Sequence, residues 1–222
     1  MHRTRIKICG IREAEDARCA IEAGADYIGL VFAEGSPRQV TIAQARNLVA
    51  EICAASRDVE PVALFANQSR ELIDEVLGNA DFRFIQLHGH EDRAFVESLD
   101  QVKVFKAVPF EADQINTWRN PPDHVAALLI DAPTHPGELT GGTGRVFDWE
   151  ALARLDRTGL PPIILAGGLT PDNVADAIRL IRPFAVDVSS GVESSRGVKS
   201  PDLIRDFCDA VHSVDSELNR NP

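Results

Sequence analysis

The sequence lacks paired cysteines, long apolar segments and an excess of basic charge. Its four cysteines show no CxxC or zinc-like spacing, which favours a chain without disulfides in a reduced, cytoplasmic setting. No apolar run approaches the roughly 20 residues of a membrane-spanning helix, and the basic start leads into only a short strand-like run, so we expect no membrane segment and no signal peptide. The chain has 34 acidic and 23 basic residues, a formal charge of −11. This charge argues against a nucleic acid or an anionic membrane as the main partner.

What the sequence does contain is typical of a globular α/β protein. With 222 residues, of which 44% are hydrophobic and 26% charged, we expect one domain over residues 1–222. Short β-rich runs recur along the chain: Arg5–Cys9, Asp26–Phe32, Pro61–Asn67, Phe82–Leu87, Val102–Val108, Val125–Asp131, Pro161–Ala166 and Phe184–Ser189. Amphipathic helical segments lie between them, among others Ala14–Ala23, Ile42–Ala54, Arg70–Leu77, Asp92–Leu99 and Asn173–Leu180.

Eight strands that alternate with helices predict a (β/α)8 TIM barrel with parallel strands. An open, doubly wound sheet is the alternative, because periodicity alone does not show that a sheet closes. In a barrel, the chemistry lies at the carboxyl ends of the strands, and phosphate binds near the loops after strands 7 and 8. The residues at those ends are therefore the candidates for function.

The first strand places two reactive side chains on one face. Because side chains alternate along a strand, Ile6 and Ile8 suit the helix-packed outside, and Lys7 and Cys9 point inward. A thiol is a useful base only as the thiolate, and a nearby cation lowers its pKa. Cys9 is thus a candidate base, although most cysteines are simply small buried hydrophobes.

The sixth strand ends in a carboxylate, Asp131, after an apolar run. Partial burial raises the pKa of such a group, as a general acid near neutral pH requires, and the alternative role is to cap the following loop. Since strands 1 and 6 lie on opposite sides of an eight-stranded barrel, we expect Cys9 and Asp131 to face each other across its mouth.

The turns after strands 7 and 8 are rich in glycine and serine. Such turns offer backbone N–H groups that no side chain blocks, as a phosphate site requires. The candidates for this site are Gly167, Gly168, Ser189, Ser190 and Gly191. Asp187 shares the inward face of Ser189, and because strands 8 and 1 are neighbours in a closed barrel, we predict an ion pair between Lys7 and Asp187.

Three further features lie on the loops of the same rim. Arg38 could bind a carboxylate or a phosphate, or be a solvated loop charge. His88 and His90 have no third ligand at convincing spacing, so we expect no metal site. The long segment Pro133–Gly144 could be a mobile lid or ordinary slack.

Helical spacing also gives expectations for the structural residues. Cys53 continues the apolar stripe of its helical segment, and Cys208 continues another, so we expect both in the core. The sequence pattern does not indicate whether the Cys19 side chain points toward the core or toward solvent. The end of the sequence, Ser216–Pro222, is expected to be frayed.

Six motifs in order resemble those of the phosphoribosylanthranilate isomerase family of tryptophan biosynthesis, from about Arg5 to Phe207. They are Lys7-Ile8-Cys9-Gly10-Ile11, Ser36-Pro37-Arg38, Gln86-Leu87-His88-Gly89, Gly141-Gly142-Thr143-Gly144 with Phe147-Asp148-Trp149, Gly167-Gly168-Leu169, and Val186-Asp187-Val188-Ser189-Ser190-Gly191-Val192-Glu193.

The resemblance implies an Amadori rearrangement of a small phosphorylated substrate, with no cofactor and no metal, by a monomer or homodimer. It implies that Cys9 is the general base and Asp131 the general acid, and that Arg38 holds the anthranilate carboxylate. The phosphate would bind at the turns Gly167-Gly168 and Ser189-Ser190-Gly191. Given the charge of −11, attraction for the substrate must come from local groups, namely Arg38, Lys7 and oriented backbone N–H donors.

The chain departs from the family pattern at Glu34, Gln39, Arg196 and Ser200, beside the expected anthranilate and phosphate loops. These departures bear on substrate affinity more than on the acid and the base. Two other functions remain open at this point. One is a different phosphosugar isomerase or epimerase on the same barrel, and the other is a catalytically silent barrel that binds a phosphorylated ligand.

Overall fold

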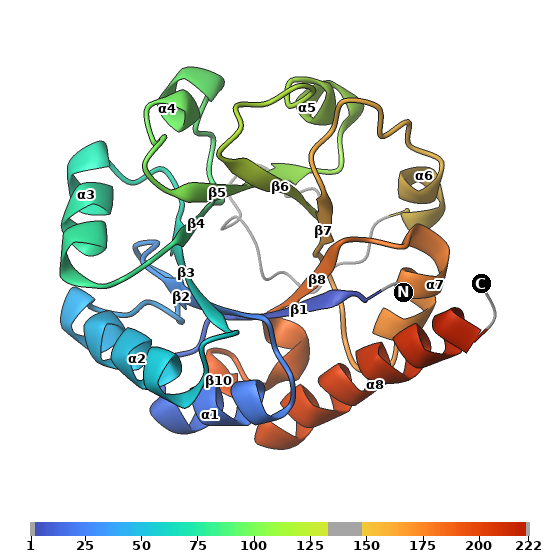
Figure 1. The fold of residues 1–222 in the computed structure, drawn as a ribbon, viewed down its shortest axis with the longest axis horizontal. Coiled ribbons are helices and arrows are strands. Elements are labelled where there is room, and N and C mark those ends of the chain that lie inside the picture. Colours follow the sequence, from blue (N-terminus) through green and yellow to red (C-terminus); the bar gives the residue numbers. More distant parts are fainter. Residues whose placement is uncertain (1–2, 133–147, 221–222) are drawn as a thin grey trace.

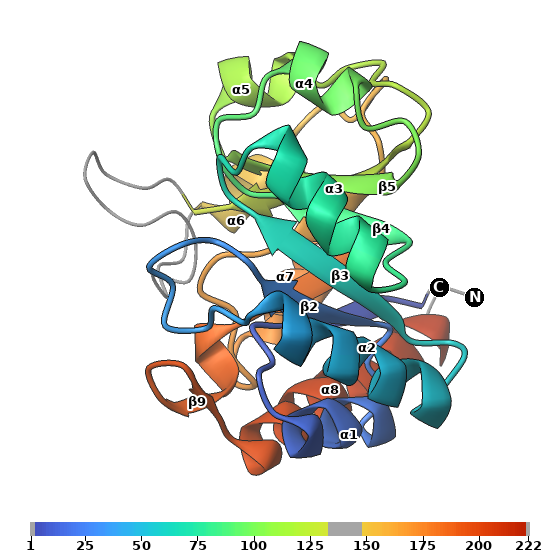
Figure 2. The ribbon, with the colours of Figure 1, turned by 90° about the vertical axis from the view of Figure 1, so that its left-hand side faces the viewer.

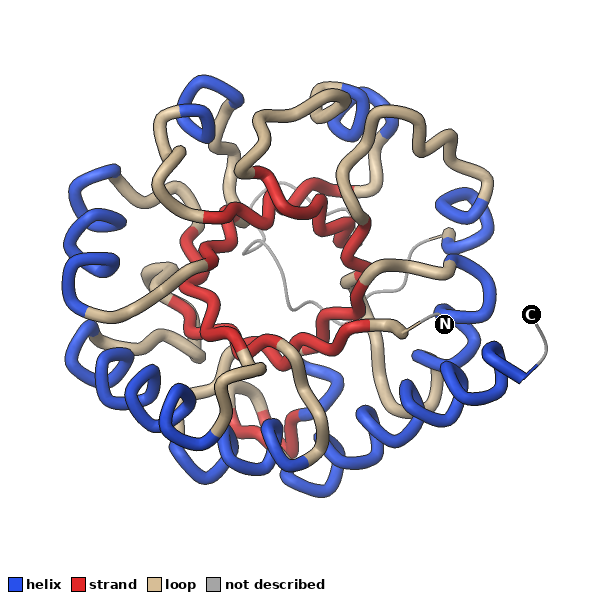
Figure 3. The backbone as a smooth tube through the Cα atoms, in the orientation of Figure 1, coloured by secondary structure: helices blue, strands red, loops and turns tan. Residues whose placement is uncertain are grey.

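Eight parallel strands close into a barrel in the computed structural model, which describes residues 3–132 and 148–220 (Figures 1 and 3). The strands follow one another around the ring in chain order, and β8 pairs with β1. They are β1 (Arg5–Cys9), β2 (Tyr27–Val31), β3 (Glu60–Phe65), β4 (Phe84–Leu87), β5 (Lys103–Pro109), β6 (Val125–Asp131), β7 (Ile163–Leu165) and β8 (Ala185–Val188). The predicted (β/α)8 TIM barrel is confirmed, and the open sheet is excluded.

Helices surround the ring of strands (Figures 1 and 3). They are α1 (Ala14–Glu22), α2 (Ile42–Ala55), α3 (Arg70–Asn79), α4 (Arg93–Glu97), α5 (Ala112–Asn116), α6 (Trp149–Ala153), α7 (Val174–Ile181) and α8 (Pro201–Arg220). Among the described residues, no helix combines the length and the apolar character that crossing a membrane requires.

A short irregular segment follows the last barrel strand. It contains a 3-10 turn, η1 (Ser190–Val192), and an antiparallel pair of strands, β9 (Glu193–Ser195) and β10 (Val198–Lys199). Figure 2 shows β9 at the end of the barrel toward which β3 points. The carboxyl ends of the barrel strands and the β9–β10 hairpin therefore lie at the same end of the molecule.

Local sequence signals explain where several helices begin. Thr41 and Gln44 form a reciprocal capping box at the start of α2. The side chains of Ser69, Asp92 and Asp148 accept hydrogen bonds from backbone N–H groups in the first turns of α3, α4 and α6. These caps fix the points at which the chain leaves the loops and enters the helical layer.

The alternation of side chains in β1 separates two apolar regions. Ile6 and Ile8 are fully buried in the large core that includes the helices, whereas Lys7 and Cys9 face the barrel interior, as predicted. The interior is filled by a second apolar cluster: Tyr27, Val62, Phe105, Ala107, Ala127, Leu129, Ile164, Ala166 and Ala185. The barrel is thus a packed core that is capped by polar groups at its carboxyl end.

The closing seam between β1 and β8 carries the predicted ion pair. Lys7 and Asp187 are register partners across the seam, and Lys7 Nζ lies 2.7 Å from Asp187 Oδ1. Lys7 is fully buried. Burial lowers the pKa of the Lys7 ammonium, but Asp187 and the neighbouring Cys9 raise it by more, so the net shift is upward and the lysine stays charged.

Two expectations about structural residues are wrong, and a third is confirmed. Cys53 is exposed, because it lies beyond the edge of the buried stripe of α2, about 100° around the helix from Ile52. The segment from Ser216 is not frayed where the structure describes it, since α8 continues to Arg220 and Leu218 is buried. Cys208 is fully buried, as predicted. The predicted lid segment Pro133–Gly144 lies outside the described residues.

Candidate active site

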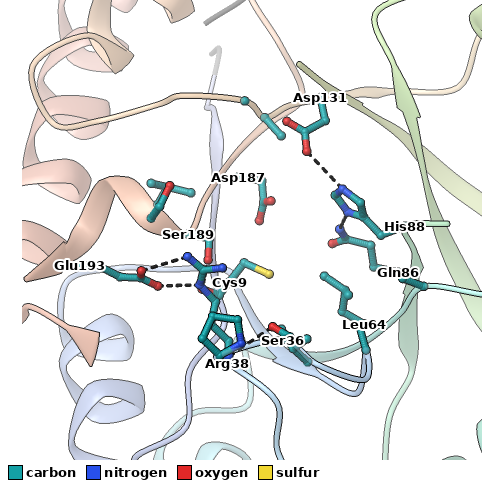
Figure 4. Close-up of a pocket in the computed structure, with 18 of the residues that line it drawn as sticks. Cys9, Ser36, Arg38, Leu64, Gln86, His88, Asp131, Asp187, Ser189 and Glu193 are labelled. Atoms are coloured by element: carbon teal, nitrogen blue, oxygen red, sulfur yellow. Dashed lines mark hydrogen bonds and ion pairs between the residues drawn. The ribbon is translucent and has the colours of Figure 1, made fainter. Parts of the chain in front are cut away.

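A cavity of 860 Å³ opens at the carboxyl ends of the barrel strands (Figure 4). Its lining includes most of the site residues predicted from the sequence: Cys9, Arg38, Asp131, Gly167, Gly168, Asp187, Ser189, Ser190 and Gly191. Lys7 is the exception, because it is buried below the cavity and does not line it. The residues from strands 1, 6, 7 and 8 therefore meet around one space.

Cys9 occupies the end of β1, with its sulfur directed into the cavity (Figure 4). Gly29 of β2 is its register partner, and a Cβ atom there would lie 2.8 Å from Cys9 Sγ and 3.1 Å from Lys7 Nζ. The glycine thus provides the space in which the thiol and the ammonium lie together. On the other side, Ser189 Oγ donates a hydrogen bond to the backbone oxygen of Cys9 at 3.1 Å.

The pKa of Cys9 is shifted in the opposite direction to the one expected for a thiol beside a cation, which would be downward. Burial raises the pKa of the thiol, and the negative charge of Asp187 raises it further. Lys7 and Lys199 lower it, but by less, so the net shift is upward. Cys9 is therefore held mainly as the thiol at neutral pH.

Asp131 ends β6 and is nearly buried, with 9% of its surface exposed. Its Oδ1 accepts a hydrogen bond of 2.7 Å from the backbone N–H of Ala132. Gly167 has a φ of +81°, and a Cβ atom there would lie 2.7 Å from the backbone nitrogen of Ala132 and 2.9 Å from Asp131 Oδ1. The glycine after β7 is thus required for the carboxyl group to lie where it does.

His88 is the side-chain partner of Asp131, with its Nε2 atom 3.1 Å from Asp131 Oδ2. Its Nδ1 atom lies 2.6 Å from Nε2 of the fully buried Gln86. Because an amide nitrogen only donates hydrogen bonds, His88 Nδ1 accepts and Nε2 carries the proton toward Asp131. This contact was not predicted from the sequence, in which His88 stands out only as a possible metal ligand. The spacing Gln86-Leu87-His88 could have indicated the role of His88, because residues two apart at a strand end point to the same face, here the barrel interior.

Arg38 lies on the loop after β2, and Glu193 of β9 holds it by two hydrogen bonds (Figure 4). Arg38 Nε donates to Glu193 Oε1 at 2.6 Å, and Nη2 donates to Oε2 at 2.9 Å. The arginine side chain passes over Gly10, where a Cβ atom would lie 2.5 Å from Arg38 Cδ. Lys199 Nζ also contacts Glu193, at 3.0 Å. No role was predicted for Glu193 or Lys199.

The two glycine-rich turns fit closely against each other. A Cβ atom on Gly191 would collide with the backbone oxygen of Leu169, which lies in the turn after β7. Gly168 has a φ of +67°, and its backbone N–H is bonded to no described residue. Asn173 Nδ2 donates to the oxygen of Gly168 at 2.9 Å and so fixes this turn. The arrangement leaves backbone donors at the cavity wall, as an anion site needs.

Within residues 3–132 and 148–220, no group of three or more histidine, cysteine and acidic side chains is placed to hold a metal ion. The ring nitrogens of His88 are both engaged by protein groups. What the cavity offers is a thiol, a carboxyl group, a guanidinium and backbone donors, which suit acid–base chemistry on an anionic ligand.

Known proteins that are similar to this chain identify its family. Residues 6–210 match the family model described as "N-(5'phosphoribosyl)anthranilate (PRA) isomerase". The chain belongs to the phosphoribosylanthranilate isomerase family. It is accordingly an isomerase of tryptophan biosynthesis.

Individual relatives cover nearly the whole chain. It is 45% identical over 212 residues to the N-(5'-phosphoribosyl)anthranilate isomerase of Hahella chejuensis, covering 95% of each chain, and 45% identical over 213 residues to that of Pseudomonas fluorescens Pf0-1, covering 95% of this chain and all of the relative. The crystal structure of the Thermotoga maritima isomerase is similar, with a TM-score of 0.83, 35% identity and coverage of 95% and 99%. A further isomerase structure, in complex with reduced 1-(o-carboxyphenylamino)-1-deoxyribulose 5-phosphate, gives a TM-score of 0.80 at 33% identity with the same coverage.

The four departures from the phosphoribosylanthranilate isomerase pattern lie in distinct places. Glu34 and Arg196 line the cavity, and Gln39 is exposed beside it. Ser200 Oγ accepts a hydrogen bond from the backbone N–H of Leu203 and so caps α8. An aspartate, which the family pattern often has at this position, would cap the helix in the same way. The serine in this isomerase therefore preserves the helix cap.

Proposed function

We propose that this chain converts N-(5'-phosphoribosyl)anthranilate to 1-(o-carboxyphenylamino)-1-deoxyribulose 5-phosphate, with Asp131 as the general acid and Cys9 as the general base. One observation carries the proposal. The thiol and the carboxyl group line one cavity from strands on different sides of the barrel, beside two turns suited to a phosphate. The relative whose structure holds the reduced product analogue supports the same choice of substrate.

Asp131 acts first in this scheme. Its proton passes to the ring oxygen of the ribose, the bond between that oxygen and C1′ breaks, and the aryl nitrogen forms a protonated Schiff base with C1′. The contacts from Ala132 and His88 keep the carboxyl group in a fixed orientation for this transfer. The developing positive charge lies on the substrate nitrogen.

Cys9 acts second. Its thiolate removes the proton from C2′, and the electron pair of that bond moves toward the Schiff-base nitrogen to give an enolamine, which tautomerises to the ketone. The raised pKa of the buried thiol disfavours the thiolate. The cationic Schiff base offsets this, because a positive charge beside the sulfur stabilises the thiolate, and Lys7 acts in the same direction.

Binding is assigned to four groups of the cavity. Arg38 binds the anthranilate carboxylate, and the phosphate binds at Gly167-Gly168 and at Ser189-Ser190-Gly191, where backbone donors are available. Asp187 in the cavity wall and Lys7 below the cavity contribute through their ion pair, which fixes charge next to Cys9. A monomeric or homodimeric state stays a prediction.

The test uses substrate that is generated in the assay, with the loss of its anthranilate-type fluorescence as the signal. We expect Cys9→Ser and Asp131→Asn each to lower turnover by roughly 10²–10⁴-fold, the contribution typical of a general acid or base. Both variants should still bind a reduced product analogue, because neither group is assigned to binding.

The matched controls are Cys53→Ser and Asp113→Asn, which make the same substitutions on the exposed surface of α2 and in the first turn of α5. They should turn over like the unmodified protein. Equal turnover by Cys9→Ser, Asp131→Asn and the unmodified protein would show that the acid–base assignment is wrong.

A further inference from the structure

Arg38 is held along one edge by a single carboxylate. The Nε and Nη2 atoms of Arg38 each bond to a different oxygen of Glu193, at 2.6 and 2.9 Å, and the exposed fractions of the two side chains are 11% and 4%. Such a paired contact fixes the plane of the guanidinium as well as its position. The rest of the guanidinium faces a cavity that Arg38 lines.

Glu193 is itself fixed by more than Arg38. Its carboxylate also accepts hydrogen bonds from Lys199 Nζ and from the backbone N–H of Gly197, both at 3.0 Å. Burial would raise the pKa of Glu193, but the hydrogen bonds from Arg38 and Gly197 and the charge of Lys199 lower it to about 2. The carboxylate is therefore ionised at any working pH and cannot release Arg38 by protonation.

The donors of Arg38 are only partly used by Glu193. Of the five N–H donors of a guanidinium, the contact uses one on Nε and one on Nη2, and Nη1 bonds to no described residue. The remaining edge, formed by Nη1 and Nη2, has the geometry that binds a second carboxylate through two hydrogen bonds. Glu193 thus determines which edge of the guanidinium is available.

The charge of this cluster also favours an anionic ligand. Arg38 and Lys199 supply two positive charges and Glu193 one negative charge, so the cluster keeps a net charge of +1. Without Lys199, the contact with Glu193 would neutralise Arg38. Lys199 Nζ also donates to the backbone oxygen of Ser189 at 2.8 Å, and so the cluster is tied to the turn after β8.

We infer that Glu193 is a positioning residue that sets the specificity of the reaction for an arylamine with an ortho carboxylate, by holding the free edge of Arg38 toward that group. This inference rests on the proposed function, in which Arg38 binds the anthranilate carboxylate. It assigns to Glu193 no contact with the substrate and no part in either proton transfer.

The experiment compares two substrates that differ only in the carboxylate, the N-(5-phosphoribosyl) derivatives of anthranilate and of aniline. The measured quantity is the ratio of their kcat/KM values. Arg38→Met should lower this ratio to near one. Glu193→Gln should lower it by about tenfold, mainly through a higher KM for the anthranilate compound, because the misoriented Arg38 loses one charge-assisted hydrogen bond to the substrate carboxylate. Glu193→Asp, which keeps the charge, should recover part of the ratio.

The decisive arm is the double variant. If Glu193 acts through Arg38, then Glu193→Gln leaves the ratio unchanged in a protein that already carries Arg38→Met. Glu97→Gln is the matched control, because it breaks an exposed pair of the same chemistry with Arg93 on α4. It should leave the ratio unaltered.

Three outcomes would overturn the inference. An equal loss for both substrates in Glu193→Gln would mean that Glu193 only holds the β9–β10 hairpin. A further change of the ratio in the double variant would mean that it acts without Arg38. A ratio that Arg38→Met leaves unchanged would instead remove the carboxylate assignment of Arg38, and with it the basis of the inference.

Discussion

Cys9 is a thiol on which burial and three charged neighbours act in opposite directions. Burial and Asp187 raise the pKa of Cys9, and Lys7 and Lys199 lower it, with a net upward shift. A raised pKa means a smaller thiolate fraction at a given pH, but also a stronger base once the proton has left. A smaller fraction of Cys9 is therefore ionised, but each thiolate is a stronger base.

This balance predicts the pH dependence of the free enzyme. Because only the thiolate reacts with iodoacetamide, the alkylation rate of Cys9 should rise with pH, by about tenfold per unit, until the pH passes the pKa of Cys9, which lies above the ordinary thiol value of about 8.5. The measurement is this rate as a function of pH, with the alkylated residue located by mass spectrometry. The exposed Cys53 serves as the internal reference. Half-maximal alkylation of Cys9 below about pH 8.5, the ordinary pKa of a thiol, would contradict the prediction.

At the scale of elements, the two turns that close the barrel behave as one unit. The turn after β7 and the turn after β8 are in close contact where Gly191 meets the backbone of Leu169, with no room between them for a side chain on Gly191. Asn173 adds a hydrogen bond from the start of the helical region to Gly168. If phosphate binds between the turns, as proposed, it would meet donors whose separation is already fixed, which would lower the entropic cost of binding.

Gly191→Ala tests this close fit. The added methyl group would displace the turn after β7, and we expect the affinity for inorganic phosphate, measured as competitive inhibition, to fall by at least about tenfold. Gly78→Ala is the control, because a Cβ atom there meets nothing within 4 Å. Its helical site should gain roughly 0.5–1 kcal/mol of stability without any change in inhibition. Unchanged inhibition in Gly191→Ala would show that the turns do not form the phosphate site.

The elements also show what sequence reasoning can reach. Strand alternation was enough to predict that Lys7 meets Asp187, because both lie inside strands whose neighbours follow from the closed ring. The same rule does not extend to Arg38 and Glu193, which are 155 residues apart on a loop and on a hairpin outside the barrel. Periodicity carries no information on such a contact.

Cys53 marks the limit of periodicity within a helix. It follows Ile52, which is fully buried, and a single position turns the side chain from the core to the solvent. His88 marks the limit at a strand end. Its inward face follows from alternation, but its contact with Asp131 depends on where two separate strands end.

At the scale of the whole molecule, a protein with a formal charge of −11 binds an anionic substrate. The long-range field opposes the approach of a molecule with a phosphate and a carboxylate, whereas in the proposed scheme short-range groups such as Arg38, Lys199 and the backbone donors attract it. The long-range repulsion and the short-range attraction can be distinguished with salt, because screening weakens interactions between distant charges more than contacts between neighbouring ones.

We therefore expect kcat/KM to rise when sodium chloride is increased from about 10 to 150 mM, as the Debye length falls from about 30 to 8 Å. The rise should stay below about tenfold, since the local contacts are little screened. The assay must avoid phosphate and sulfate buffers, which compete for the anion site. A steep fall of kcat/KM with salt would mean instead that the field around the cavity mouth steers the substrate inward.

The seam between β1 and β8 has a consequence for how the chain is made. A ribosome delivers Lys7 long before it delivers Asp187, 180 residues later. Until that partner has been synthesised, an ammonium group inside the barrel would have no counter-charge, and water is the more favourable place for it. We therefore expect β1 to be locked into the barrel only after β8 has been synthesised, so that a nascent chain that stalls before Asp187 leaves the ring open.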